Sequence, residues 1–283
     1  MTATIKSAVA EAAETLRESG IGEPRGEAGL LLMDLLKCER AFLLAHEDQT
    51  LSSPQFEQYR ALVIRRADGW PLQYLTGHQE FYRLDFEVTP DVLIPRPETE
   101  LIVEAALPLL KTHPTPRFAD VGTGSGCIAI SLLHELPSAR AVAADAAGAA
   151  LVVARRNAER HRVLGRLRLV ESDLFSAIDS DERFHVIVSN PPYIPARDLK
   201  ALQREVRREP QSALDGGPDG LVIIRRLLTD AADFLHQGGY FIFEIGLGQA
   251  DSIKDLIAGG AWELIELRRD LQGIPRTVVV RRR

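Results

Sequence analysis

The residues best suited to chemistry in this chain are Asn190-Pro191-Pro192-Tyr193, which directly follow a short apolar run over residues 184–189. Proline fixes its own φ, lacks an N–H and restricts the residue before it, so this turn is expected to be stiff. The Asn190 side-chain oxygen and the Pro191 carbonyl provide two acceptors for the hydrogens of a planar –NH₂ group, and the Tyr193 ring suits its flat face. Taken alone, the segment is also compatible with an ordinary loop after a strand.

A glycine-rich segment follows an expected strand over residues 117–121. Glycine allows positive φ and a close approach of the backbone to a ligand, and ligands in open α/β sheets bind beyond the carboxyl ends of the strands. The spacing is Gly-x-Gly-x-Gly and differs from the Gly-x-Gly-x-x-Gly of dinucleotide-binding folds. It predicts a ligand-binding loop formed by Gly122, Thr123, Gly124, Ser125 and Gly126.

Two further strand ends carry groups that suit a nucleoside. Asp145 ends the next expected strand, where a carboxylate accepts hydrogen bonds from both hydroxyls of a ribose, caps the following helix, or does both. Asp173 ends the third strand and is an acceptor for an adenine amino group, with Leu174 and Phe175 beside the ring. Ligand-like features at three successive strand ends predict an adenosine-containing cofactor.

The two groups of residues together predict methyl transfer from S-adenosylmethionine to a planar nitrogen. An amide nitrogen is a poor nucleophile because its lone pair is delocalised into the carbonyl. Acceptors on its N–H groups would direct it at the sulfonium methyl, mainly through positioning and electrostatic complementarity. Asn190 would then lie close to the cofactor as well as to the substrate. The leaving thioether is already activated by positive charge, so no metal is expected.

Short apolar runs alternate with helical patterns from Arg117 onward, which favours a mainly parallel sheet with helices on both faces. Helices are expected at about 126–136, 147–162, 220–237 and 249–258. Strands are expected over 117–121, 140–145, 167–172, 184–189, 239–245, 262–268 and 276–281. The short connection over 273–275 predicts that the last two strands form an antiparallel hairpin, which makes this seven-stranded sheet mixed.

The first 75 residues carry apolar residues at helical spacing and predict a small all-helical domain. Gly20 is expected to end the first helix, Pro24 to open the second, and Ser53-Pro54 to cap and open a third. Residues 76–97 alternate between apolar and polar, with Thr89-Pro90-Asp91 as the expected turn of a β-hairpin. The predicted organisation is a helical domain over 1–75, a β-hairpin linker over 76–97 and an α/β catalytic domain over 98–283.

The charge of the chain argues against a dedicated nucleic-acid binder. The formal net charge is −6, and residues 1–75 are themselves acidic, whereas proteins that hold nucleic acid tightly usually present a basic surface. Two distant cysteines favour a reducing compartment. No apolar run approaches the length of a membrane span. We therefore expect a cytoplasmic enzyme with no membrane association and no stable nucleic-acid binding.

The segment Asn190–Tyr193 resembles the (N/D)PPY motif of class I methyltransferases that modify planar nitrogens. Three further segments are similar to the HemK family, the peptide chain release factor glutamine N5-methyltransferases: Pro71–Gly77, Ile94–Glu100 and Arg269–Arg276. This likeness covers nearly the whole chain. It implies a class I methyltransferase fold that is Rossmann-like, S-adenosylmethionine as cofactor, and the Gly-Gly-Gln glutamine of class 1 release factors as substrate.

Carried onto this chain, the resemblance implies that Asn190 to Tyr193 hold the glutamine amide. We expect the helical domain, as the natural candidate, to recognise the release factor. It also implies that Gly122 to Gly126, Asp145 and Leu174 line the cofactor site. Two departures are visible. Ala146-Ala147 stands where relatives often have Ser-Pro, which puts the helix cap in doubt. Leu174 stands where some relatives have Trp, which puts the stacking on adenine in doubt.

The main alternative is an adenine-N6 methyltransferase acting on DNA or RNA, because a flipped adenine presents the same flat –NH₂ group. The acidic charge and the lack of a basic target-reading segment weigh against it. An inactive cofactor-binding scaffold is disfavoured by the intact Asn190 with both prolines. Arg96 and Glu98 either shape the acceptor pocket or pair with each other. His185 lies inside an expected strand and is interpreted as packed.

Overall fold

The computed structural model describes residues 3–283 and divides into two compact units. The first comprises the chain up to His78 together with Gln203–Arg208, and the second comprises Gln79–Leu202 and Glu209–Arg283. A short segment of the long connection after the fourth expected strand therefore belongs to the N-terminal unit. Nothing in the hydrophobic pattern of the sequence indicates this return.

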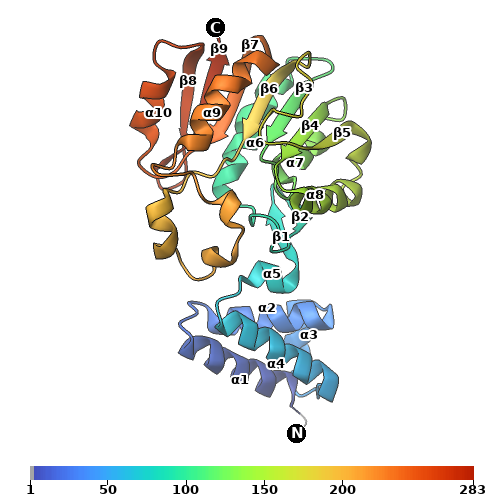
Figure 1. Ribbon diagram of the computed structural model, residues 1–283. Helices are drawn as coiled ribbons and strands as arrows, with labels where there is room; N and C mark the ends of the chain where they lie inside the picture. The colour runs from blue at the N-terminus through green and yellow to red at the C-terminus, as the bar shows by residue number, and fades with distance from the viewer. Residues whose placement is uncertain (1–2) are drawn as a thin grey trace. The chain divides into compact units, whose positions relative to one another are not determined.

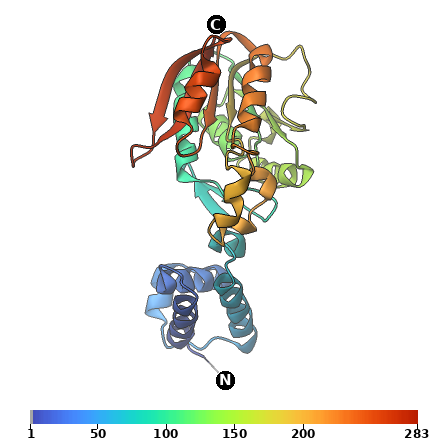
Figure 2. The same cartoon turned by 60° about the vertical axis from the view of Figure 1, so that its left-hand side comes forward.

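The first unit is helical, as expected (Figure 2), and two of its helices begin at residues whose side chains cap them. The Thr4 and Ser52 side chains each accept the backbone N–H three residues on and form capping boxes with Ser7 and Gln55. The expected cap at Ser53 is thus wrong by one residue, because Ser53 is already helical. The helices are α1 (Ile5–Glu18), α2 (Pro24–Leu36), α3 (Arg40–Ala45), α4 (Ser53–Ala67) and α5 (Leu72–Thr76).

An apolar core shared by α1, α2 and α4 holds this unit together. A buried charge lies beside that core, because Arg66 of α4 has only 8% of its side chain exposed. Its guanidinium pairs with Glu27 of α2 and, at 3.0 Å, with Glu205 of the returning segment. A buried guanidinium needs such partners, so these pairs tie the returning segment to the helices.

The second unit contains a seven-stranded sheet with the strand order β5-β4-β3-β6-β7-β9-β8 (Figure 1). The first five strands run parallel, and β9 is antiparallel to both of its neighbours, which confirms the mixed sheet. The strand order reverses between β3 and β6. The strands are β3 (Arg117–Val121), β4 (Arg140–Asp145), β5 (Leu167–Glu171), β6 (Phe184–Ser189), β7 (Leu235–Glu244), β8 (Trp262–Arg269) and β9 (Pro275–Arg282).

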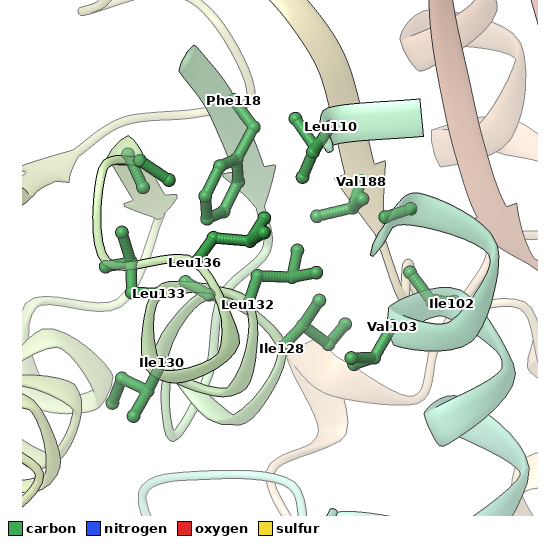
Figure 3. Packing of buried hydrophobic residues seen from close by; sticks show 14 of the residues in the cluster. Ile102, Val103, Leu110, Phe118, Ile128, Ile130, Leu132, Leu133, Leu136 and Val188 are labelled. Carbon is green, nitrogen blue, oxygen red and sulfur yellow. The ribbon is translucent and has the colours of Figure 1, made fainter. Parts of the chain in front are cut away.

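Helices cover both faces of this sheet because alternate residues of each strand point to opposite faces. Along β3, Phe118 enters the core beneath α6 (Glu100–Leu110), α7 (Cys127–Glu135) and α8 (Gly148–Arg160). Ala119 and Val121 enter the core beneath α9 (Val222–Asp230) and α10 (Ala250–Ile257), which lie on the other side (Figure 2). Figure 3 shows part of the first of these cores. Val103 of α6 and Ile128 and Leu132 of α7 lie in the same apolar cluster as two residues of the sheet, Phe118 of β3 and Val188 of β6.

Short 3₁₀ segments complete the architecture. In the second unit they are Pro97–Thr99, Leu164–Arg166, Ala196–Ala201, Gln211–Ala213 and Ala231–Phe234, and in the first unit Val206–Arg208. The expected helix over 220–237 is too long, because β7 already begins at Leu235, which pairs with Phe184 of β6. The pattern misled because Ala231, Ala232, Phe234 and Leu235 continue the apolar spacing of α9 after the backbone has left the α-helix.

The β-hairpin forms, but its turn differs from the expected one. It pairs β1 (His78–Phe81) with β2 (Leu84–Glu87), and the turn consists of Tyr82 and Arg83. Both turn residues have positive φ, 48° and 63°, as a two-residue hairpin turn requires. The expected turn at Thr89-Pro90-Asp91 is therefore wrong. Glycine or asparagine usually marks such a turn, and neither residue is present at Tyr82 or Arg83.

Candidate functional site

A cavity of about 420 Å³ opens at the carboxyl ends of β3, β4, β5 and β6, where the strand order reverses. Ligands bind in this position in open α/β sheets, and the volume suits a small-molecule cofactor. The cavity brings together these residues singled out from the sequence: Gly122, Thr123, Gly124, Ser125, Asp145, Asp173, Leu174, Asn190 and Pro192. Gly126, Pro191 and Tyr193 are not among its lining residues.

The glycine loop is shaped for a ligand by its backbone. The N–H groups of Gly122 and Thr123 both donate to the Ala144 carbonyl, at 2.8 and 3.0 Å, which anchors the loop to β4. Gly122 and Gly124 have φ of 78° and 55°, and a Cβ added to either would meet no protein atom within 4 Å. The space beside these two glycines is therefore open to a ligand.

Gly126 has a different role from the other two glycines. A Cβ at this position would come within 2.8 Å of the Ile130 Cδ1 and 3.3 Å of the Ala154 Cβ. Its φ of 82° is also unfavourable for any other residue. Gly126 thus permits the close packing of α7 against α8, and it faces protein instead of the cavity.

Asp145 accepts two backbone hydrogen bonds at the mouth of the loop. Its Oδ2 accepts the Gly124 N–H at 2.8 Å, and its Oδ1 accepts the Ala147 N–H at 2.9 Å. It braces both the glycine loop and Ala147, the residue before α8, even though Ser-Pro is missing after it. A carboxylate has about four acceptor positions, so two remain for ligand hydroxyls. Burial raises the pKa of Asp145, and the backbone N–H donors oppose that rise.

Asp120, which sequence reasoning passed over, lies buried beneath the loop. Its Oδ2 accepts the Thr123 hydroxyl at 2.7 Å and the Ala129 N–H at 3.2 Å. Burial raises the pKa of Asp120 to about 7, against the effect of these two donors. The only signal in the sequence was an acidic residue inside the apolar strand over 117–121. Asp120 fixes the loop from below and does not line the cavity.

The third strand end forms a tight, locally braced turn. The Ser172 hydroxyl donates to the Leu174 carbonyl at 2.9 Å and accepts the Ala177 N–H at 3.0 Å. Leu174 is held at a φ of 54°, which a residue with a Cβ rarely adopts. The carboxylate of Asp173 pairs with Arg226 at 2.8 Å and keeps 63% of its surface exposed, and this partner lowers its pKa.

Asn190 is oriented by a chain of hydrogen bonds that reaches β7. Its Nδ2 donates to the Thr99 hydroxyl at 3.0 Å, and that hydroxyl donates to Oε2 of Glu244 at 2.6 Å. The Tyr193 hydroxyl donates to the other carboxylate oxygen of Glu244 at 3.1 Å. The nitrogen end of the Asn190 amide is therefore directed at Thr99, which leaves its oxygen for another donor.

Glu244 ends β7 and is almost completely buried, with 1% of its surface exposed. Burial raises the pKa of Glu244 to about 7, although Thr99, Tyr193 and Arg276 all favour the charged form. Neither Glu244 nor Thr99 is among the site residues predicted from the sequence. A lone carboxylate ending an apolar strand was the available signal for Glu244, and Thr99 gave none.

The segment around Arg96 closes one side of the cavity. Arg96 pairs with Glu209 and donates to the Ile94 carbonyl at 3.0 Å, and the Ile94 N–H donates to the same Glu209 carboxylate at 3.1 Å. The expected alternative of a pair between Arg96 and Glu98 is wrong. These bonds connect Pro95 and Pro210, both of which line the cavity.

His185 is packed, and it lies at the opposite end of the sheet. Its Nδ1 accepts the backbone N–H of Arg117, which begins β3, at 3.0 Å, and its ring lies beside those of His113 and His236. Between residues 3 and 283 no group of three or more histidine, cysteine or acidic side chains is arranged to hold a metal ion. Among the same residues, no helix is both long and apolar enough to cross a membrane.

The sequence of the chain is similar to those of known methyltransferases. Residues 7–77 match the model of the PrmC N-terminal domain, and residues 99–224 match that of the methyltransferase small domain. A release factor glutamine methyltransferase of Moorella thermoacetica is 44% identical over 99% of both chains. Another, from Koribacter versatilis, is 42% identical over 99% of both. A methyltransferase from Pyrococcus furiosus with a known crystal structure is 18% identical in sequence, and the match covers 70% of this chain and 88% of that one. Its TM-score is 0.50, and this likeness supports the fold alone.

Proposed function

Because the chain belongs to the release factor glutamine methyltransferase family, we propose that it methylates a glutamine side chain. The methyl donor is S-adenosylmethionine, and the acceptor is the amide nitrogen, N5, of the glutamine in the Gly-Gly-Gln motif of class 1 peptide chain release factors. The sulfonium–methyl bond breaks as the nitrogen–methyl bond forms, the thioether leaves uncharged, and the nitrogen loses one proton.

The residues of the cavity suit this cofactor. Asp145 retains two acceptor positions beside open space at Gly122 and Gly124, as the two hydroxyls of a ribose require. Leu174 and Ile223 offer apolar contact for an adenine ring. Asp173 remains our proposed acceptor for the adenine amino group, in competition with Arg226. The bound cofactor supplies a methyl group that is already activated by the adjacent positive charge.

The orientation of Asn190 is the observation that supports the acceptor side. Since its Nδ2 is engaged by Thr99 at 3.0 Å, its Oδ1 is the end that is available to accept an N–H of a planar –NH₂ group. We assign the second N–H to the Pro191 carbonyl, with Pro192 lining the cavity beside it. The Tyr193 hydroxyl is held by Glu244, so we propose that only the ring of Tyr193 contacts the glutamine.

The helical unit is our candidate for recognising the body of the release factor, and we expect the enzyme to act in the cytoplasm. We propose that the chain is organised as a helical domain over 1–75, a hairpin linker over 76–97 and a catalytic domain over 98–283. The model of the PrmC N-terminal domain ends at residue 77, close to that first boundary.

Labelled S-adenosylmethionine tests the proposed function directly. The purified chain is expected to label a class 1 release factor, and replacing the Gly-Gly-Gln glutamine by alanine in that factor is expected to abolish the label. A duplex and a single strand containing adenine serve as competing acceptors in the same assay. Label that persists on the substituted factor, or that accumulates on adenine, contradicts the proposal and favours the adenine-N6 alternative.

A further inference from the structure

A buried polar chain links the carboxyl end of β7 to the Asn190 side chain. It runs from Glu244 through the Thr99 hydroxyl to the Asn190 amide, with links of 2.6 and 3.0 Å. Glu244 and Thr99 are 1% and 2% exposed. Glu244 does not line the cavity, so it has no direct access to a substrate.

We propose that Glu244 is a positioning residue whose carboxylate, acting through the Thr99 hydroxyl, fixes which end of the Asn190 amide faces the acceptor nitrogen. This role rests on the proposed function, because it concerns how Asn190 receives the glutamine –NH₂ group. Glu244 itself touches neither substrate nor cofactor.

The donors and acceptors available to Glu244, Thr99 and Asn190 determine this orientation. An ionised carboxylate only accepts hydrogen bonds, so the single hydroxyl proton of Thr99 must point at Glu244. The Thr99 oxygen then presents only lone pairs to Asn190. Only the nitrogen end of the amide is able to donate to them, and the oxygen end is turned away from Thr99. A charged group buried in β7 thereby sets the orientation of a neutral amide two hydrogen bonds away.

Protonation of Glu244 removes this constraint. A neutral carboxyl is able to donate its own proton to Thr99 or to Tyr193, which frees the Thr99 hydroxyl to donate to the Asn190 oxygen. The amide then rotates and presents its –NH₂ end to the cavity. Two –NH₂ groups facing each other form no hydrogen bond, so the acceptor glutamine loses its partner.

The surroundings of Glu244 raise its pKa so that its protonation takes place near neutral pH. The charged groups around it are Arg276, which favours ionisation, and Glu98, which opposes it, while burial is the largest influence and raises the pKa of Glu244 to about 7. The remaining titratable neighbours are Tyr193 and Cys127. Burial raises the pKa of Cys127 to about 12 and that of Tyr193 above its ordinary value, so neither ionises near neutrality.

Steady-state kinetics of Glu244→Gln test the role. Glutamine keeps the shape and retains partners for Thr99 and Tyr193, but it donates as well as accepts and no longer dictates the direction of the Thr99 proton. We expect kcat to fall on the order of 10- to 100-fold, with the KM for S-adenosylmethionine unchanged. In the wild-type enzyme, kcat is expected to fall as the pH drops through about 7. This fall is expected to be smaller in the variant, in which Asp120 beneath the glycine loop still titrates.

Thr277→Val is the matched control. Thr277 lies opposite Glu244 in the β7–β9 pairing and is fully buried, and its hydroxyl has no hydrogen-bond partner among residues 3–283. The substitution changes a buried hydroxyl next to the carboxylate and leaves the hydrogen bonds from Glu244 to Asn190 intact, so wild-type kinetics and pH dependence are expected.

Thr99→Val removes the hydroxyl that links Glu244 to Asn190. Combined with Glu244→Gln, it is expected to add no further loss, because both changes remove the same constraint.

A second measurement needs no acceptor substrate. The sequence contains two asparagines, Asn157 and Asn190, so selective ¹⁵N-asparagine labelling gives two side-chain amide signals. Asn157 serves as the internal reference, since its amide is held by Glu87 and Ser125. We expect the Asn190 signal to titrate near pH 7 in the wild-type protein and to stay constant in Glu244→Gln.

The outcomes separate this role from the proposed function. A wild-type chain that labels no release factor contradicts the function, whereas the Asn190 titration still tests the positioning role. Unchanged kcat in Glu244→Gln, or an Asn190 signal that titrates identically without the carboxylate, overturns the positioning role while leaving the function standing.

Discussion

The backbone N–H of Gly124 donates to Oδ2 of Asp145 across 2.8 Å, which ties the loop after β3 to the residue that ends β4. The same carboxylate holds the Ala147 N–H at the start of α8. Removing it therefore loosens two elements of the cofactor site at once, in addition to removing the acceptor that we assign to the ribose.

Asp145→Ala is accordingly expected to weaken S-adenosylmethionine binding by about 10- to 100-fold, the range for lost hydrogen bonds to a charged group. Isothermal titration calorimetry measures this directly. Asp173→Ala is the comparison, because that side chain is 63% exposed and already paired with Arg226, and a smaller loss is expected. A larger loss from Asp173→Ala than from Asp145→Ala would reverse our assignment of the two carboxylates.

Substitutions of two glycines in the loop are expected to affect different properties, one the stability of the fold and the other the affinity for the cofactor. At Gly126 an added Cβ meets Ile130 at 2.8 Å and Ala154 at 3.3 Å, so Gly126→Ala should chiefly destabilise the fold. At Gly124 the added Cβ meets no protein atom within 4 Å but enters the open space beside the cavity, so Gly124→Ala should chiefly weaken cofactor binding. Each change also places alanine at positive φ, at a cost of about 1–2 kcal/mol.

Thermal unfolding and cofactor titration of both variants check this contrast. Gly126→Ala should show the larger fall in Tm, and Gly124→Ala the larger rise in Kd. Equal effects on both quantities would mean that the two glycines share one role.

The site residues that could be predicted from the sequence are those that lie at, or directly after, the end of a strand. Asp145 ends an apolar strand, the glycine loop follows another directly, and parallel strands bring their carboxyl ends to one edge. The contact between Thr99 and Glu244 joins residues 145 positions apart. It depends on how the segment before α6 packs against β7, and no periodicity encodes that packing.

The errors in the fold have equally local causes. The Tyr82-Arg83 turn lacks the glycine or asparagine that usually marks positive φ. The 3₁₀ segment Ala231–Phe234 and the start of β7 continue the apolar spacing of α9, so the end of that helix is invisible in the pattern. The return of Gln203–Arg208 to the helical unit rests on specific ion pairs, such as that between Arg66 and Glu205.

Asn190→Ala is expected to remove turnover, because it deletes the acceptor oxygen that directs the glutamine nitrogen. A loss of about 100-fold or more in kcat is typical when such a group is removed. Cofactor affinity should change little, since the glycine loop and Asp145 are untouched. Single-turnover methylation together with calorimetric binding separates the two effects. A large loss of cofactor affinity would mean that Asn190 serves mainly to hold the cofactor.

Ionised Glu244 is expected to lower the stability of the folded protein above neutral pH. Burial raises the pKa of Glu244 from its ordinary value of 4.5 to about 7, so the folded state binds this proton more tightly than the unfolded chain does. Stability rises with pH only where the unfolded state binds more protons. For Glu244 the sign is opposite, and its contribution falls as the pH rises from about 4.5 to about 7. Asp120, with its pKa also raised to about 7 by burial, adds a fall of the same sign.

Glu244→Gln removes the first of these two contributions. The variant should therefore be more stable than the wild-type protein at pH 8, by at most roughly 3 kcal/mol, which is the free energy of a shift of about two and a half pKa units. It should also lose stability less steeply between about pH 5 and 8, while the contribution of Asp120 is retained. Denaturant unfolding across this range measures both quantities. A variant that is slower in methyl transfer and yet more stable shows that Glu244 is kept for positioning Asn190; a variant that is slower and less stable would assign its effect to a damaged fold.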